Sequence, residues 1–186
     1  MSIICQTQKT FINLIRKIVF LPQKYTLMKK LFILFTLSFL TLFSCKKEKV
    51  FTYQDQLALD IIKINEYLDG KGIKSEYQVT ASSLYYKITD EGNADGIKPV
   101  PSSTVKVKYK GYFLNGEVFD QTTGTDVAEF PVDGVIKGFA EGLQLLHKKG
   151  KSTIILPSGL AYGPRGSGSI DPNTPIIFDL ELVDFQ

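Results

Sequence analysis

Three features of the sequence predict an α+β domain built mainly from short strands. Alternating apolar and polar residues, which are typical of a strand with one solvated face, occur at 105–110 and again at 176–185. Between these strands, helical apolar spacing is confined to one short segment at 138–146. An amphipathic segment at 54–69 precedes all of the strands, and no internal repeat is visible. Many short strands with one short helix, preceded by a helical extension, indicate the α+β class.

Charge is divided unevenly along the chain. Six of the 22 basic residues and none of the 19 acidic residues precede Cys45. The part that follows therefore carries 16 basic against 19 acidic residues, without a basic block longer than two residues. A mildly acidic domain of this kind gives no reason to expect nucleic acid as a partner.

The first 45 residues resemble a secretion signal rather than part of a domain. Lys29 and Lys30 precede a 13-residue apolar run at 31–43, which is too short to span a bilayer. The sequence Leu-Phe-Ser-Cys at 42–45 resembles a bacterial lipobox, in which the chain is cut before a cysteine that carries a lipid. An uncleaved membrane anchor is the alternative, because Phe43 stands where a small residue is commoner.

Acylation of Cys45 would anchor the protein firmly, since each buried methylene contributes about 0.8 kcal/mol. We expect translation to begin at Met28 and the protein to lie in the envelope of a Gram-negative bacterium, lipid-anchored, at the outer membrane. Cys5 and Cys45 are the only cysteines of the chain. The domain that follows therefore has no disulfide and no thiol chemistry, although the compartment is oxidising.

The segment at 54–69 has the features of an amphipathic helix. Thr52 and Asp55 have the spacing of a capping box, and Gly70 supplies a stop. Its apolar residues recur at helical spacing, as Leu57, Ile61, Ile64 and Leu68. This stripe packs on the domain or, in the alternative, forms a dimerisation face. In either case we expect the helix to affect stability or association rather than chemistry.

The first strands and their turns are expected between residues 84 and 119. A strand at 84–88 is followed by a turn-rich surface loop at 90–103. In the strand at 105–110 the apolar residues alternate with three lysines, which form its wet face. Asn115 and Gly116 stand between apolar runs and predict a hairpin with a two-residue turn.

The second half of the domain is expected to contain one helix and two strands. The helix at 138–146 carries Phe139, Leu143 and Leu146 on one face. Strands at 151–156 and 176–185 flank a loop rich in glycine, proline and serine. This loop, at 157–175, is long for a small domain, and such loops are usually functional or mobile.

The residues present give no support for hydrolytic, redox or metal-dependent chemistry. His147 is the only histidine and is expected to be an ordinary surface residue. The stretch Gly163–Gly168 superficially suggests a phosphate loop, but no strand leads into a helix there. The acidic residues lack metal-ligand spacing, so we expect neither a cofactor nor a metal.

Five short sequence pieces occur in the order typical of one family. They are Tyr-x-Gly at 109–111, Phe-Asp at 119–120, Val-Ile-x-Gly at 135–138, Ala-Tyr-Gly at 161–163 and Phe-Asp-x-Glu-Leu at 178–182. Together they resemble the FKBP-type peptidyl-prolyl cis-trans isomerases, in the form of a bacterial lipoprotein. The resemblance implies a twisted antiparallel sheet wrapped around a short helix, with an aromatic hollow between them. The resemblance covers roughly 84–185. Together with the lipobox and the amphipathic segment, it leads us to expect a leader and signal peptide at 1–44, with the true start at Met28, a tether at 45–52, a helical extension at 53–82 and an isomerase domain at 83–186.

The resemblance also implies roles for individual residues. The residues expected to be catalytic are Tyr109, Phe119, Asp120, Phe139 and Tyr162. The residues expected to bind substrate are Phe130, Val135, Ile136, Ile170 and Phe178, and Cys45 is the expected lipidation site. In this interpretation Phe139 forms the floor of the hollow, Tyr162 donates a hydrogen bond to a substrate carbonyl and Asp120 orients polar atoms at the rim.

The implied activity is isomerisation of prolyl bonds during the folding of exported proteins. Its partners would be proline-containing polypeptides, the membrane through Cys45, and macrolides as candidate ligands. Phe139 replaces the usual tryptophan, Ala128 stands where many relatives have an aromatic residue, and two loops near the hollow are shortened. These departures keep open a non-catalytic proline-peptide binding module or holding chaperone on the same fold, and a purely structural envelope lipoprotein.

Overall fold

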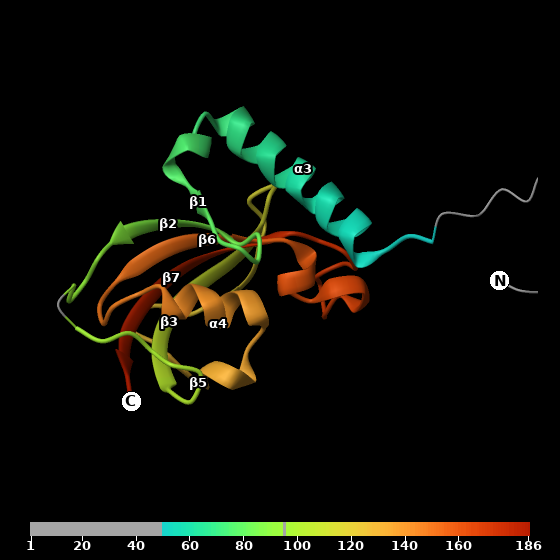
Figure 1. Cartoon of the computed structure of the whole chain (residues 1–186). Coiled ribbons are helices and arrows are strands. Elements are labelled where there is room, and N and C mark those ends of the chain that lie inside the picture. Colours follow the sequence, from blue (N-terminus) through green and yellow to red (C-terminus); the bar gives the residue numbers. More distant parts are fainter. Residues whose placement is uncertain (1–49, 95) are drawn as a thin grey trace, which may run out of the picture. The chain divides into compact units, whose positions relative to one another are not determined.

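An antiparallel sheet forms the centre of the described structure (Figure 1). The computed structural model describes residues 50–94 and 96–186. The predicted signal peptide and the predicted lipidation site Cys45 lie outside these residues. None of the helices within the described range combines the length and the apolar character needed to cross a bilayer.

The described part contains seven strands, paired antiparallel throughout, in the order β1-β2-β6-β7-β3-β4, with β5 also paired to β3. They are β1 (Gln78–Val79), β2 (Tyr85–Asp90), β3 (Thr104–Phe113), β4 (Val118–Gln121), β5 (Ala128–Pro131), β6 (Lys151–Leu156) and β7 (Ile176–Phe185). One short helix, α4 (Lys137–Gln144), packs against this sheet, and a longer helix, α3 (Tyr53–Lys71), precedes it. The predicted α+β class is therefore confirmed.

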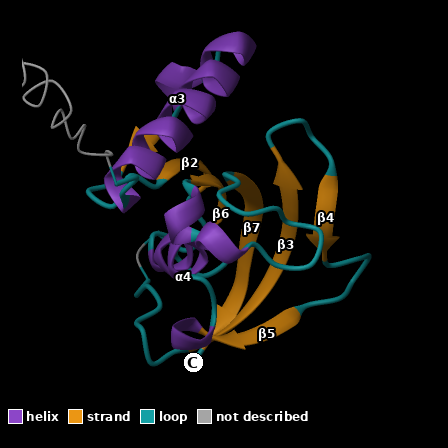
Figure 2. Cartoon of the chain, turned by 90° about the vertical axis from the view of Figure 1, so that its right-hand side faces the viewer, coloured by secondary structure: helices purple, strands orange, loops and turns teal. Residues whose placement is uncertain are grey.

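The curvature of the sheet comes largely from β3, which has β7 along one edge and two shorter strands along the other. Its first half, Thr104–Val107, pairs with β5, and its second half pairs with β4. Register shifts interrupt the pairing with β7 after Lys106 and the pairing with β4 after Gly111. Such bulges increase the local twist. The sheet consequently bends around α4, as Figure 2 shows.

The two central strands β6 and β7 bury side chains on both faces of the sheet. Ile154, Leu156 and Phe178 point towards α4 and belong to the larger core, here called the α4-side core. Ile155 and Ile177 alternate with them and join Ile64, Leu68 and Tyr85 beneath α3 in a smaller core, here called the α3-side core. The two helices therefore lie on opposite faces of the sheet (Figure 1).

Helix α3 begins one residue earlier and ends two residues later than predicted. The Thr52 side chain accepts a hydrogen bond from the backbone N–H of Asp55, and the Asp55 carboxylate accepts from the backbone N–H of Thr52, so the capping box is confirmed. The expected stop at Gly70 is wrong, because Gly70 lies inside the helix. Gly72 takes the left-handed conformation with φ 69° and donates to the carbonyls of Leu68 and Asp69, which is the usual form of a glycine cap at a helix C-terminus.

The stripe on which α3 packs shares only Ile64 and Leu68 with the predicted one. Its fully buried residues are Asp60, Ile64 and Leu68, at successive intervals of four. Leu57 and Ile61, which were expected in the stripe, are only half-buried. The stripe is covered by this chain's own sheet, in agreement with the packing interpretation. Each fully buried aliphatic side chain contributes about 1.5–3 kcal/mol.

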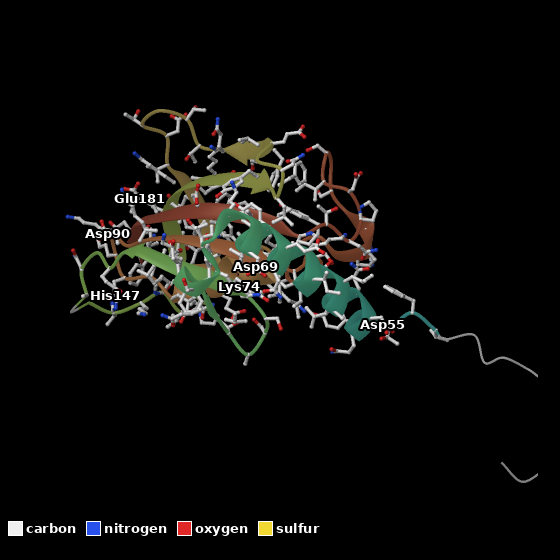
Figure 3. All side chains as sticks on the ribbon, turned by 90° about the horizontal axis from the view of Figure 1, so that it is seen from above. Asp55, Asp69, Lys74, Asp90, His147 and Glu181 are labelled. Carbon is white, nitrogen blue, oxygen red and sulfur yellow. The ribbon has the colours of Figure 1, made fainter. Side chains whose placement is uncertain are left out.

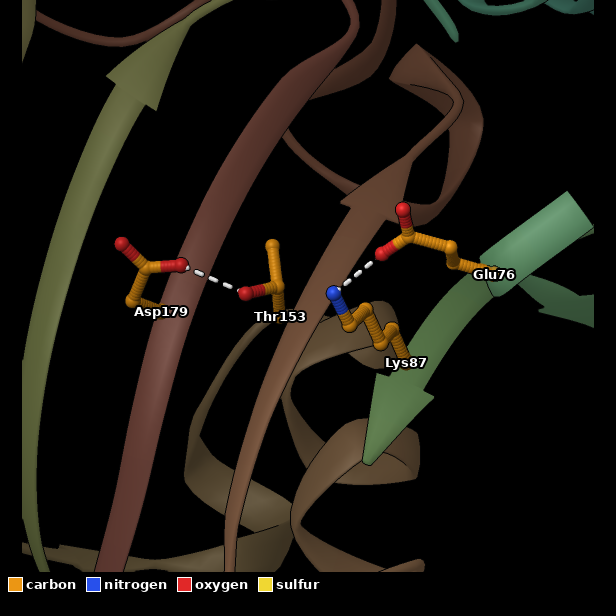
Figure 4. Close-up of polar contacts among 4 residues, drawn as sticks. All are labelled: Glu76, Lys87, Thr153 and Asp179. Atoms are coloured by element: carbon orange, nitrogen blue, oxygen red, sulfur yellow. Dashed lines mark hydrogen bonds and ion pairs between the residues drawn. The ribbon is translucent and has the colours of Figure 1, made fainter. Parts of the chain in front are cut away.

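Polar contacts on the same face of the sheet join its strands to one another, and one ion pair fastens the segment after α3 to the sheet. The hydroxyl of Thr153 on β6 donates to Asp179 Oδ1 on β7 at 2.7 Å, and Lys87 on β2 forms an ion pair with Glu76 (Figure 4). Asp179 also accepts a hydrogen bond from the Tyr112 hydroxyl. The short helix η3 (Lys74–Glu76) and strand β1 lie between α3 and β2.

The remaining sequence expectations agree with the structure to within a few residues, apart from one turn. Strands at 151–156 and 176–185 are confirmed with the same bounds, whereas the first strand and the short helix are shifted by a residue or two. The hairpin predicted at Asn115-Gly116 is present, but the prediction of a two-residue turn is wrong. The backbone N–H of Phe113 donates to the carbonyl of Glu117, and Gly116 has φ 91°. This is a three-residue connection with glycine at its positive-φ position.

Two buried serines differ in whether their hydroxyl has a hydrogen-bond partner, and this difference leads to a prediction for stability. Ser152 is 2% exposed, and its Oγ has no hydrogen-bond partner among the described residues, whereas Ser158 Oγ, in a side chain 1% exposed, donates to Asp60 at 2.5 Å. Ser152→Ala should leave the free energy of unfolding unchanged or raise it by about 1 kcal/mol, because no bond is lost. Ser158→Ala should lower it by about 1.5–3 kcal/mol, because a bond to a carboxylate is lost. Urea unfolding of both variants checks this, and destabilisation by Ser152→Ala equal to that by Ser158→Ala would contradict it.

Candidate active site

A hollow of about 330 Å³ lies between α4 and the concave face of the sheet. Strands β3, β4, β5 and β7 supply its walls, while the start of α4 and the loop before β7 close its ends. Its lining consists of Tyr109, Asp120, Phe130, Gly134, Val135, Ile136, Phe139, Tyr162 and Phe178. Aromatic and aliphatic side chains dominate this lining, so the hollow suits an apolar group of modest size.

Phe139 of α4 forms the base of the aromatic arrangement. It is 4% exposed, and its ring meets Phe178 of β7 edge to face at a centroid distance of 5.0 Å. The Tyr109 ring approaches Phe139 at 5.8 Å in the same geometry, and Phe130 of β5 does so at 6.3 Å. Edge-to-face pairs contribute about 0.5–1.5 kcal/mol beyond the area that they bury. The rings therefore hold one another in place around the hollow.

Gly111 explains why the Tyr-x-Gly piece carries a glycine. A Cβ atom at Gly111 would lie 2.5 Å from the ring of Phe119 and 2.7 Å from that of Phe178. The absence of a side chain lets these two rings pack across β3, edge to face at 5.6 Å. Phe119 thereby supports Phe178 from behind.

Eight of the ten residues expected in the hollow are brought together there, and two lie behind its lining. Phe119 packs between Phe113 and Phe178 without lining the hollow. Ile170 is 6% exposed and belongs to the α4-side core. Gly134, which sequence reasoning did not single out, lines the hollow at its β5 end.

The polar groups of the hollow are two tyrosine hydroxyls and one carboxylate. The Tyr109 hydroxyl donates a hydrogen bond to Asp120 Oδ2 at 2.7 Å. Burial, followed by this hydrogen bond, raises the pKa of Tyr109 to about 12. Burial, followed by the nearby charge of Asp120, also raises the pKa of Tyr162. Both phenols are therefore protonated at neutral pH and can act as donors.

Tyr162 is held by the long loop before β7. Within the described residues its hydroxyl has no hydrogen-bond partner, so it is available to a ligand. Two short helices, η5 (Ser158–Leu160) and η6 (Gly163–Arg165), flank it in sequence. Leu160 anchors the first in the α4-side core, and the Gly163 carbonyl accepts from the backbone N–H of Asn173. This loop is ordered by these contacts rather than being a plain surface loop.

Sequence reasoning missed Asp60 and Ser158. Asp60 of α3 is fully buried and accepts hydrogen bonds from both the backbone N–H and the hydroxyl of Ser158 in η5. One signal was available, because Asp60 lies four residues before Ile64 and eight before Leu68. A carboxylate in the middle of an apolar stripe is expensive to bury without a partner. It therefore indicates a partner elsewhere in the chain.

His147 lies outside the hollow. It stands near Asp90, far from Asp55 in the first turn of α3 (Figure 3). Its Nδ1 is 2.8 Å from the carbonyl oxygen of Gly96 in the loop before β3. This contact ties two surface segments together.

A short helix held against a bent antiparallel sheet, with an aromatic hollow between them, defines the class of FKBP-like domains. A family model described as FKBP-type peptidyl-prolyl cis-trans isomerase matches residues 95–183. A probable FKBP-type isomerase of Haemophilus influenzae is 46% identical over 122 residues, which are 64% of this chain and 48% of the relative. The outer membrane protein MIP of Legionella longbeachae is 40% identical over 126 residues, covering 67% and 53%.

The fold of this chain is also similar to solved structures. The crystal structure of FkpA from Escherichia coli superposes with a TM-score of 0.62 at 27% identity, covering 98% of this chain and 91% of that one. The crystal structure of AtFKBP13 gives a TM-score of 0.53 at 31% identity, covering 59% and 98%. The chain belongs to the family of FKBP-type peptidyl-prolyl cis-trans isomerases. It spans about half the length of the curated relatives that it matches.

The surroundings of Tyr109 generate a prediction for alkaline pH. Its pKa of about 12 in the folded protein exceeds the ordinary value of 10.0, so the unfolded chain loses this proton first. The stabilisation from the buried neutral phenol is therefore complete below about pH 10 and is lost as the pH rises towards about 12. Denaturant unfolding at a series of alkaline pH values should show a steeper loss in the wild type than in Tyr109→Phe.

A matched variant separates the causes of this shift. Asp120→Asn removes the charge but not the burial, so ultraviolet titration should find the pKa of Tyr109 lower than in the wild type and still above its ordinary value. A pKa that stays unchanged in Asp120→Asn would contradict the contact described here.

Proposed function

We propose that this protein catalyses cis-trans isomerisation of prolyl peptide bonds in the hollow between α4 and the sheet. The observation that carries the proposal is the set of edge-to-face rings around Phe139, with two protonated tyrosine hydroxyls at its edge. Membership of the FKBP-type family supports the same activity. Proline is the natural occupant, because its ring fills an apolar hollow and its peptide bond has two nearly balanced isomers.

The physical reason for catalysis is a difference in solvation between the planar and the twisted amide. Rotation about a peptide bond meets a barrier of about 18–20 kcal/mol, because resonance holds the planar form. The twisted transition state has a less polar carbonyl group. A dry lining such as that of Phe139 and Phe178 therefore disfavours the planar form relative to the twisted one. Each 1.4 kcal/mol of such differential binding accelerates the reaction about tenfold.

The polar groups have distinct roles in this mechanism. Tyr162, whose hydroxyl has no partner among the described residues, donates to a substrate carbonyl next to the prolyl bond. Asp120 holds the hydroxyl of Tyr109 and thereby orients that ring at the rim. Phe139 forms the floor on which the proline ring rests. No proton is transferred in any step.

A binding module without catalysis is the second candidate. Ala128 of β5 is half-buried and does not line the hollow, so one wall carries no aromatic side chain at that position. A protease-coupled assay on a series of proline tetrapeptides distinguishes the two. Acceleration supports the isomerase, whereas binding of the same peptides without acceleration would support the module.

The position of the protein in the cell is a separate proposal. The lipobox at 42–45 supports lipidation of Cys45, and the similarity to the outer membrane protein MIP supports an envelope location. On this basis the domain at 83–186 acts on exported proline-containing chains from a lipid anchor, with the segment at 45–52 as its tether. Macrolides that mimic a proline ring are candidate inhibitors of the same hollow.

Tyr162→Phe tests the hydrogen bond to substrate. The variant keeps the ring and deletes only a hydroxyl that has no partner among the described residues, so stability should change little. The lost hydrogen bond is worth about 0.5–1.5 kcal/mol, so kcat/KM should fall by up to about tenfold. As a contrast, Phe139→Ala should lower the free energy of unfolding by about 3–5 kcal/mol, because it empties the floor. Full activity in Tyr162→Phe would remove Tyr162 from the mechanism.

The pH profile tests the absence of proton transfer. Because both phenols have raised pKa values, kcat/KM should be flat between about pH 6 and 8. His147→Ala should reproduce the same flat profile. A steep dependence that vanishes in His147→Ala would refute the desolvation mechanism.

Cys45→Ser tests the lipid anchor. The variant should accumulate as an unprocessed precursor or be released in soluble form, because the thiol that carries the lipid is gone. Mass spectrometry and membrane fractionation of cells that express both forms provide the measurement. An unchanged mass and unchanged membrane association would contradict lipidation.

A further inference from the structure

Helix α3 touches the loop of the proposed active site through one buried carboxylate. Asp60 is 0% exposed, and its Oδ2 accepts hydrogen bonds from the backbone N–H of Ser158 at 2.8 Å and from the Ser158 hydroxyl at 2.5 Å. Its Oδ1 accepts from the side-chain amide of Gln56 at 2.7 Å. Three donors therefore satisfy a group that would otherwise be costly to bury.

Stability alone is a poor explanation for this carboxylate. An apolar residue at position 60 would continue the stripe of Ile64 and Leu68, whereas a buried carboxylate must first be stripped of water. What the carboxylate provides is geometry, because two bonds to one residue fix both the backbone and the side chain of Ser158. The contact therefore specifies where η5 lies relative to α3.

The turn held in this way leads directly to Tyr162. Ser158 begins η5, and the backbone N–H of Ala161 donates back to the Ser158 carbonyl. Tyr162 follows at once, and η5 contacts both η6 and α4. A displacement of Ser158 is therefore passed to Tyr162 within a single turn of backbone.

A cavity lies beside the Asp60–Ser158 contact, between α3 and this turn. This second cavity, of about 290 Å³, is lined on one side by Leu57 and on the other by Pro164. The Tyr53 ring bridges it at Gly159, where a Cβ atom would lie 2.4 Å from the ring. With a cavity in place of continuous packing, the Asp60–Ser158 contact is a directional constraint on this side of the turn.

We infer that Asp60 is a positioning residue of the site, which through Ser158 holds the turn that places the Tyr162 hydroxyl at the hollow. The inference rests on the proposed isomerase function. It gives α3 a role in chemistry, whereas the sequence alone assigned this helix to stability or association.

The test compares three single variants of the full chain. Asp60→Leu replaces the carboxylate and both of its acceptors with an apolar side chain, and should lower kcat/KM about two- to tenfold, which is the range expected for loss of the Tyr162 hydrogen bond. Asp60→Asn keeps one oxygen for Ser158, and the Gln56 amide can turn to accept from the new amide group, so activity should stay within about twofold of the wild type. Ile64→Ala, one turn along the same stripe, is the matched control and should lower stability without changing kcat/KM.

A double-mutant cycle distinguishes positioning from general loosening. If Asp60 acts through Tyr162, Asp60→Leu in a Tyr162→Phe background should cause no further loss of kcat/KM. Additive losses, or wild-type kcat/KM in a folded Asp60→Leu, would overturn the inference. Should Asp60→Leu fail to fold, Ser158→Ala takes its place. Its kcat/KM should fall about two- to threefold, and this loss should also vanish in the Tyr162→Phe background.

Nuclear magnetic resonance separates this inference from the proposed function. A wild-type protein without isomerase activity would refute the function, and the positioning would then be decided by amide spectra alone. Asp60→Leu should shift the amide signals of Ala161, Tyr162 and Gly163, whereas Ile64→Ala should leave them in place. Unshifted signals in Asp60→Leu would overturn the positioning.

Discussion

The rest of the structure depends on β7, a strand buried on both of its faces. Its consecutive residues Ile177, Phe178 and Asp179 serve three different purposes. Phe178 lines the hollow beneath α4, and Ile177 packs under α3 on the opposite face. Asp179 accepts hydrogen bonds from Thr153 and Tyr112 and so joins three strands. Because neighbouring side chains of a strand point to opposite faces, a shift of one residue in its register would destroy both cores and the hollow together.

The hollow is a consequence of how aromatic side chains fill the space between a bent sheet and a short helix. Phe139 and Phe178 meet edge to face. Gly111 has no side chain, and this leaves the space in which the rings of Phe119 and Phe178 pack. Burial of the two phenols raises the pKa of Tyr109 and of Tyr162. A site of this kind is rich in neutral donors and apolar surface. It is suited to a reaction that is limited by bond rotation rather than by proton transfer.

Helix α3 illustrates how one polar residue can connect an extension to a site. Ile64 and Leu68 account for its adhesion to the sheet, and any apolar stripe would serve that purpose. Asp60 is different, because its contact with Ser158 is directional and reaches the turn before Tyr162. Directional hydrogen bonds to a buried carboxylate fix position more sharply than apolar contacts, which tolerate sliding. An extension that lies outside the family match can in this way influence the hollow on the other face.

Local pattern in the sequence was sufficient for the class of fold, for most strands and for the capping box at Thr52 and Asp55. These features depend on residues close together in the chain, where alternation and side-chain caps act directly. The family resemblance named the residues of the hollow, although Phe119 and Ile170 proved to stand behind its lining. Only the tertiary structure decided which residues line the hollow, where α3 ends and what Asp60 binds. The end of α3 depends on Gly72 rather than Gly70 taking the left-handed conformation. The lining and the partner of Asp60 depend on groups far apart in sequence, since Asp60 and Ser158 meet across 98 positions of the chain, and no local pattern encodes such a meeting.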